Sequence, residues 1–248
     1  MPKTLQLFSD THCEYFNGDI TLLDPLINPG TNYLVIAGDF ASLADLDWYI
    51  KCLNHLSPHY KHIVLVFGNH DHFYISVKED LHRCRLELTS AVKNLTILYT
   101  DLGIVDLDGV KFFGDTCFYP EYPTTPRLSR GFIDHRLIKD FDPWVYENNT
   151  KYRKKFNSLP LNDVIVVNHH APSWRSVLKR WINNESNIFF VNDLEKDIVA
   201  KQPKYILAGH MHEFINYYIN KTEIIHNPFG YVTERGSNGF NPKLILDV

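Results

Sequence analysis

The sequence predicts an α/β protein built on a mixed sheet. Short apolar runs recur along the chain, each ends at polar residues that can bind metals or move protons, and helical segments separate several of them. The pair Asp108-Gly109 between two further apolar runs is a strong β-hairpin signal, which adds antiparallel pairing to a parallel core. Because open α/β sheets build their sites at the carboxyl ends of buried strands, the polar residues there are expected to gather.

The composition is that of a globular protein with a sizeable core. The chain has 248 residues, of which 44% are hydrophobic and 22% charged, and this suits a single domain over 1–248. Its formal net charge of -4 gives no strong sign of nucleic-acid binding, because such surfaces usually carry a basic excess.

Nothing in the pattern predicts contact with a membrane. No apolar run reaches the length that spans a bilayer, and the first residues lack the core of a signal peptide. The four cysteines lie far apart with no C-x-x-C pair, so reduced thiols are expected. A cytoplasmic protein is therefore predicted.

In the first half of the chain, strands alternate with helices. The residues from Ser42 to Asp45 form a capping box, the apolar residues that follow fall on one helical face, and Pro58 ends this helix. A second helix is expected to begin at Ser76. Strands are expected over 5–8, 33–37, 63–67 and 95–99, followed by a hairpin of 104–107 with 110–113.

The segment 118–160 has no clean periodicity despite many aromatic residues and several prolines. A long irregular segment inside a domain is usually functional or disordered, and the aromatic content argues against disorder. We therefore expect an aromatic-rich rim packed over the site, with short helices. Within it, 151–155 is expected to be a solvated helix face.

In the second half, Ser173 is expected to cap a helix whose residues Trp174, Trp181 and Ile182 recur at helical spacing and pack in the core. Apolar runs and turn residues predict the remaining elements. These are strands over 164–167, 205–208 and 244–246, a short helix over 193–200, and a hairpin of 214–219 with 222–225.

The polar residues after the apolar runs suit a metal site. Turns favour Asn, Asp and Gly but not repeated His, so turns alone do not explain the set. The carboxylate of Asp39 can bridge two cations, and nitrogen and oxygen ligands without thiolate suit Mn²⁺, Fe or Zn²⁺ better than Mg²⁺ or Ca²⁺. Asp10, His12 and His212 would complete the shell of one ion, and Asn69, His169 and His210 that of the other.

As a set, these motifs resemble the calcineurin-like metallophosphoesterase superfamily, in a bacterial or phage cytosolic branch. The motifs are D-x-H at 10–12, G-D at 38–39, G-N-H-D at 68–71, His169, and G-H-x-H at 209–212. The resemblance implies a four-layer α/β/β/α sandwich of two mixed sheets flanked by helices. It also implies the ligand set above, with His70 as the catalytic histidine and Asp71 as the carboxylate that holds it.

Three further residues are candidates for binding substrate. The forked donors of Arg136 could hold a phosphate, although an ordinary surface ion pair explains this residue equally well. In the branch that the chain resembles, His135 and His170 are expected beside the ligands.

These features predict a dinuclear metal-dependent hydrolase of phosphomonoesters or phosphodiesters. A metal-bridging hydroxide would attack phosphorus, and His70 would be the acid for the leaving group. Two divalent or trivalent ions are expected, chosen from Mn, Fe and Zn, with Mn expected to support activity best in vitro. The substrate would be a small or nucleotide-like phosphoester. All seven ligand positions carry competent side chains, which favours an enzyme over a catalytically silent binding scaffold. A nuclease is a lesser alternative, because the chain is slightly acidic and ends soon after its last motif.

Overall fold

Two mixed β-sheets form the centre of the protein in the computed structural model, which describes residues 3–248. The strands are β1 Thr4–Phe8, β2 Tyr33–Ala37, β3 His62–Val66, β4 Leu95–Ile97, β5 Val105–Leu107, β6 Val110–Asp115, β7 Ile165–Asn168, β8 Tyr205–Ala208, β9 Ile215–Ile219, β10 Thr222–His226 and β11 Ile245–Asp247. The first sheet has the order β11-β1-β2-β3-β4 and the second the order β5-β6-β7-β8-β10-β9. Parallel pairing in the middle of each sheet gives way to antiparallel pairing at the β11, β5 and β9 edges.

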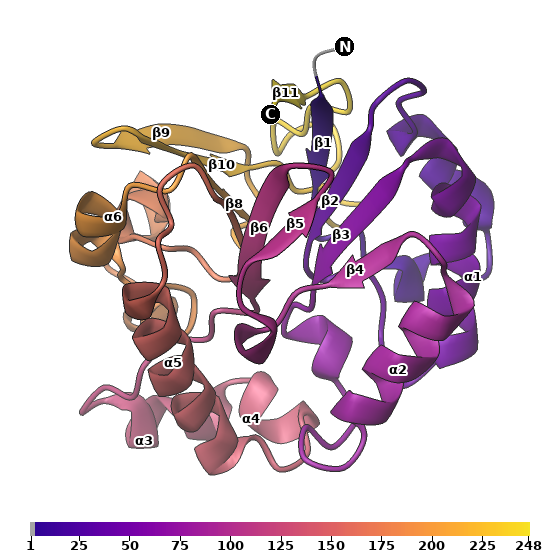
Figure 1. Cartoon of the computed structure of the whole chain (residues 1–248). Coiled ribbons are helices and arrows are strands. Elements are labelled where there is room, and N and C mark those ends of the chain that lie inside the picture. The colour runs from indigo at the N-terminus through magenta and orange to yellow at the C-terminus, as the bar shows by residue number, and fades with distance from the viewer. Residues whose placement is uncertain (1–2) are drawn as a thin grey trace.

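Helices cover the outer faces of both sheets. They are α1 Leu46–Leu56, α2 Leu81–Ala91, α3 Thr125–Leu128, α4 Asp134–Leu137, α5 Phe141–Ser158 and α6 Glu195–Lys201. Figure 1 shows α1 and α2 on one side of the paired sheets, α5 and α6 on the other, and α3 and α4 below them. This is the expected four-layer α/β/β/α sandwich. No described helix is long and apolar enough to cross a membrane.

The buried residues of β2 show why the sheets stack in this way. Tyr33, Val35 and Ala37 belong to the apolar cluster between the two sheets, whereas Leu34 and Ile36 belong to the cluster under α1 and α2. Successive side chains of a strand point to opposite faces, so a strand buried on both faces reads as a continuous apolar run. The same explanation holds for β3, whereas the apolar run of β1 is interrupted by Gln6, which is buried and donates a hydrogen bond to the carbonyl of Leu26. The strand predictions for all three are confirmed.

The prediction for 118–160 was wrong in one respect, because the segment contains the long helix α5 and not only short helices. After the break at Asp142, the buried residues of this helix are Val145, Asn149, Tyr152 and Phe156, at spacings that fit one helical face. The buried Asn149 hides this pattern in the sequence, and its side-chain amide donates a hydrogen bond to the carbonyl of Phe118. Lys151 and Lys154 are exposed on the other face of the helix, as expected.

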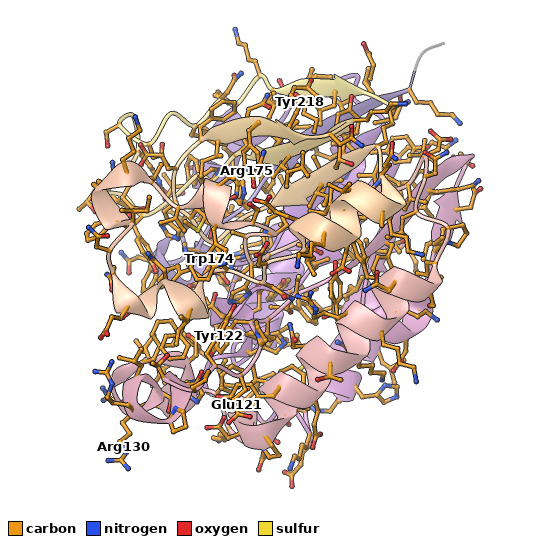
Figure 2. The ribbon with its side chains drawn as sticks, turned by 90° about the vertical axis from the view of Figure 1, so that its left-hand side faces the viewer. Glu121, Tyr122, Arg130, Trp174, Arg175 and Tyr218 are labelled. Carbon is orange, nitrogen blue, oxygen red and sulfur yellow. The ribbon has the colours of Figure 1, made fainter. Side chains whose placement is uncertain are left out.

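The predicted core helix after Ser173 was also wrong. Ser173 does cap a turn, accepting a hydrogen bond from the amide of Arg175 at 3.0 Å, but this turn is a 3-10 helix that ends after Ser176. The backbone at Val177 is extended, and two further 3-10 turns, Lys179–Trp181 and Glu185–Phe189, follow in place of a continuous helix. Trp174 is therefore 39% exposed and Trp181 52% exposed. Figure 2 shows Trp174 on the outer face, between Tyr122 and Arg175 in that view.

Candidate metal centre

All seven predicted ligands follow the carboxyl ends of parallel strands, and the structure brings them together. Three strands of the first sheet and two of the second contribute, so the centre lies where the two sheets meet. Backbone hydrogen bonds join the loops, for example from Asp10 N to Gly38 O and from Gly209 N to His169 O, both 3.0 Å. The ligands are Asp10 and His12 after β1, Asp39 after β2, Asn69 after β3, His169 after β7, and His210 and His212 after β8.

The ligand atoms form two groups that share one carboxylate. In the first, atoms of Asp10, His12, Asp39 and His212 lie within 4.8 Å of one another. In the second, atoms of Asp39, His169 and His210 meet the same limit. Asn69 joins the second group, since its Oδ1 lies 3.0 Å from His169 Nε2. Asp39 is thus placed to contact ions in both groups.

The imidazoles are anchored through their Nδ1 atoms. Nδ1 of His169 lies 2.9 Å from the carbonyl of Ala37, that of His12 lies 3.0 Å from Glu14, and that of His212 lies 2.7 Å from Glu234. Such partners fix the Nδ1–H tautomer and leave the Nε2 lone pair to bind a metal. The structure therefore presents several Nε2 lone pairs to one region.

The Nε2 atoms of the ligand histidines face carboxylates, amide oxygen or one another, and one of them has no partner within the described residues. Nε2 of His12 and Nε2 of His212 lie 3.3 Å apart, and the buried Nε2 of His210 has no hydrogen-bond partner. Buried polar atoms are nearly always paired, so an unpartnered nitrogen beside carboxylates suits a metal ligand. The donor set therefore fits metal ions.

The charges of the buried carboxylates and imidazoles also favour metal binding. Burial opposes ionisation of Asp39, but the nearby histidines outweigh it and hold the pKa of this carboxyl well below its usual range. Burial also opposes protonation of His169 and His212, yet the carboxylates beside them raise the pKa of His169 to about 9 and that of His212 to about 10. The buried carboxylates thus attract positive charge to this point, which is what a metal ion supplies.

The backbone at the centre is strained. Asp10, His12, Asp39, His210 and His212 have φ between 50° and 67°, in the left-handed region. Asp, Asn and His enter this region more readily than other residues with a Cβ, but each instance still costs free energy. The fold holds five ligand residues in this conformation, and such strain clusters at functional sites.

Two glycines beside the ligands, Gly38 and Gly68, leave no room for a side chain because neighbouring ligand side chains lie against their backbone. A Cβ at Gly68 would collide with the Asp39 carboxylate, and one at Gly38 would collide with the His169 ring. Both glycines of these motifs are therefore needed to bring Asp39 and His169 close to neighbouring backbone.

His70 faces the centre without belonging to either ligand group that shares Asp39. Its amide donates to Asp39 Oδ1 at 2.9 Å, and its ring lies at the edge of a cavity of about 650 Å³. Nε2 of the ring lies 3.4 Å from the hydroxyl of Tyr231, and Nδ1 lies 3.8 Å from Glu14 Oε1. Asp39, Asn69, His210 and His212 line the same cavity. The His70 ring is thus placed beside a molecule bound at the metal centre.

Comparison with known proteins agrees with this geometry. The sequence model of the family described as calcineurin-like phosphoesterase matches residues 5–214. The chain belongs to the calcineurin-like phosphoesterase family. The family typically binds two metal ions, and the Asp and His cluster described above is able to hold metal. Curated proteins gave no match.

Solved structures share the fold of this calcineurin-like phosphoesterase at low sequence identity. Phosphopantetheinyl hydrolase (PptH) from Mycobacterium tuberculosis superposes with a TM-score of 0.75 at 14% identity, over 100% of this chain and 96% of that protein. TT1561 of Thermus thermophilus has a TM-score of 0.58 at 12% identity, over 92% of this chain and 90% of that protein. At these identities the likeness concerns the fold.

Asp71 of this calcineurin-like phosphoesterase is placed differently from the prediction. Its carboxylate accepts hydrogen bonds from the amides of Asp39 at 2.7 Å and Gly68 at 2.6 Å, and from the hydroxyl of Tyr49 at 2.8 Å. Within residues 3–248, no hydrogen bond joins it to the His70 ring. This corrects the expected contact, because Asp71 fixes the backbone of the two ligand loops and not the imidazole.

We expect Asp71→Ala to lower the free energy of unfolding by about 3 kcal/mol, because it leaves buried amides without an acceptor. Tyr49→Phe removes only one donor to the same carboxylate and should cost about 1 kcal/mol. Urea unfolding of the metal-free proteins measures both. Equal stability of Asp71→Ala and the parent protein would contradict this role for Asp71.

Three carboxylates that support the site, Asp134, Glu14 and the Glu234 that holds His212, were not identified from the sequence. Asp134, on α4, is fully buried and accepts a hydrogen bond from Asn69 Nδ2 at 3.0 Å, which turns Asn69 Oδ1 toward the ligand group. Burial raises the pKa of Asp134 to about 7, against the lowering effect of this hydrogen bond. Glu14 binds Nδ1 of His12. The only sequence signal was an acidic residue two positions after a predicted histidine ligand.

The three substrate-binding candidates lie apart from the cavity lining. Arg136 is exposed on α4, and the arginine that does line the cavity is Arg180. Nδ1 of His135 lies 2.8 Å from Asp142. The ring of His170 is buried against that of His210, with centroids 4.3 Å apart, so it touches a ligand rather than the cavity. Substrate contact by these residues stays a prediction.

Proposed function

We propose that this protein is a dinuclear metal-dependent hydrolase of phosphoester bonds. The observation that carries the proposal is the pair of ligand groups sharing Asp39, with the His70 ring beside them at the edge of a cavity. Two ions bridged by one carboxylate are a known arrangement in phosphate-ester hydrolysis. All seven ligand positions and His70 are present and converge, which favours an enzyme over a silent scaffold of the same fold.

Each group of residues has its own task in this proposal. One ion would be held by Asp10, His12 and His212. The other ion would be held by Asn69, His169 and His210, and Asp39 would bind both ions. Bound ions would supply an activated water and stabilise negative charge on the phosphoryl oxygens. Manganese, iron and zinc suit these ligands, with manganese the first to test.

His70 would give a proton to the oxygen that leaves phosphorus. Its Nε2 is on the cavity side, near the Tyr231 hydroxyl, and its amide is fixed by Asp39. Glu14, near Nδ1, would steady the ring together with that of His12. General acids of this kind typically contribute about 10²–10⁴-fold to the rate.

The substrate of the proposed enzyme is a small or nucleotide-like phosphoester, and the protein acts in the cytoplasm.

A panel of phosphoester substrates tests the proposed hydrolase activity. Protein stripped with a chelator should be inactive on 4-nitrophenyl phosphate and bis(4-nitrophenyl) phosphate, and Mn²⁺ should restore turnover of at least one of them. Cleavage of single-stranded or duplex DNA in preference to both would favour a nuclease. No turnover with Mn²⁺, Fe²⁺ or Zn²⁺ would favour the scaffold.

A further inference from the structure

The cavity at the metal centre extends well beyond the reacting phosphate. Its floor includes Asp39, Asn69 and His210, and its outer part is formed by the segments around Phe132, Trp181 and Glu234. Its volume of about 650 Å³ lies within the range that holds a drug-sized organic molecule. The cavity therefore has room for an organic part of the substrate beside its phosphate.

Those walls offer little to a second anionic group. Among the described residues that line the cavity, Arg180 is the only arginine or lysine, and its guanidinium is 2.7 Å from Glu213, which also lines the cavity. Asp134 and Glu234 also line the cavity, but Asp134 is fully buried against Asn69 and Glu234 lies 2.7 Å from Nδ1 of His212. Anionic groups are usually bound by unpaired Arg or Lys side chains or by backbone amides. A second phosphate or a carboxylate on the substrate would therefore find no unpaired Arg or Lys side chain among the described residues of the lining.

Apolar side chains form much of the outer wall. Phe132 and Ile133 precede α4, while Trp181, Phe190 and Met211 come from the second half of the chain. Phe190 packs against the ligand His210, with ring centroids 4.5 Å apart. Ile133 is 46% exposed and Trp181 52% exposed. Large apolar side chains left exposed around a cavity indicate a surface that a ligand covers.

We propose that the substrate carries its reacting phosphate as its only charged group, joined to an uncharged and largely apolar organic part that lies against Trp181 and Phe190. The inference rests on the proposed function, and it narrows the substrate class. Nucleoside di- and triphosphates, sugar bisphosphates and acidic phosphopeptides fall outside that class. Hydrolysis adds water across one P–O bond, and the leaving oxygen takes a proton, so the products are an uncharged alcohol and a phosphate species.

Three phosphonates that cannot be hydrolysed test this inference by calorimetric binding to the Mn²⁺-loaded protein. Methylphosphonate has the head group alone, benzylphosphonate adds an uncharged ring, and 4-carboxybenzylphosphonate adds a negative charge to that ring. We expect benzylphosphonate to bind about tenfold more tightly than methylphosphonate, and the carboxylate to remove about tenfold of that affinity. Equal affinities, or tightest binding of the carboxylate, would overturn the inference.

Substitutions in the cavity wall test whether the preference for benzylphosphonate arises at Trp181. Trp181→Ala should reduce the advantage of benzylphosphonate over methylphosphonate several-fold, whereas Trp174→Ala, a partly exposed tryptophan outside the cavity lining, should leave that advantage intact. Glu213→Gln frees Arg180 and should strengthen binding of 4-carboxybenzylphosphonate. No change in any variant would overturn the inference. Phosphonate binding without phosphoester hydrolysis would contradict the proposed function alone, and binding of none of the three would contradict both.

Discussion

Replacing Asp39 with asparagine is expected to remove bound metal and to lower phosphoester hydrolysis by at least about 10³-fold. Asp39 is the carboxylate common to both ligand groups, and it is fully buried beside His169 and His12. An amide keeps one oxygen to accept the hydrogen bond from His70 N, but it carries no charge and is a poor bridge between two cations. Both sites should therefore lose affinity together.

Elemental analysis of the purified variant, alongside its activity, checks this prediction. Asp47→Asn is the matched control, because Asp47 is exposed on α1 and should keep full metal content and rate. The circular dichroism spectrum should show that Asp39→Asn is folded. Full occupancy of both metal sites in a folded Asp39→Asn protein would contradict the bridging role.

For His70→Ala, the expected result is a loss that depends on the leaving group. A poor leaving group such as an alkoxide needs a proton as the P–O bond breaks, whereas nitrophenolate leaves without one. Alkyl esters should therefore lose about 10²–10⁴-fold in kcat, and nitrophenyl esters much less. His70 belongs to neither group that shares Asp39, so metal content should stay near that of the parent protein.

The comparison needs one alkyl and one nitrophenyl ester of the same phosphate class, assayed with the parent protein and the variant. His59→Ala, at an exposed position, is the control for removal of a histidine. If both esters lost rate to the same extent, His70 would have a binding or positioning role and would not be the leaving-group acid.

The sequence was sufficient to predict the strands and the residues that follow them. Strands such as β3 are apolar on both faces, and their neighbours in the sheet are parallel, so the ends that carry Asp39 and Asn69 had to lie close together. The convergence of His12 with His212, 200 residues apart, followed from the same rule applied to two stacked sheets.

The supporting residues could not be predicted in that way. The contact of Asp134 with Asn69 spans 65 residues and depends on how the segment 118–160 folds back over the strand ends. Asp and His tolerate the left-handed region better than most residues, but the packing of the loops decides which of them adopt it. Trp181 was predicted to be in the core because its spacing suited a long helix. It lies instead at the end of a three-residue 3-10 turn, Lys179–Trp181, and lines the cavity.

The most direct test of the dinuclear centre is anomalous diffraction from crystals of the protein loaded with Mn²⁺. We expect two manganese peaks about 3.5–4 Å apart, with the Asp39 carboxylate between them. Asn69, His169 and His210 should surround one peak, and Asp10, His12 and His212 the other. A single ion, or two ions that do not share Asp39, would contradict a dinuclear centre bridged by this carboxylate.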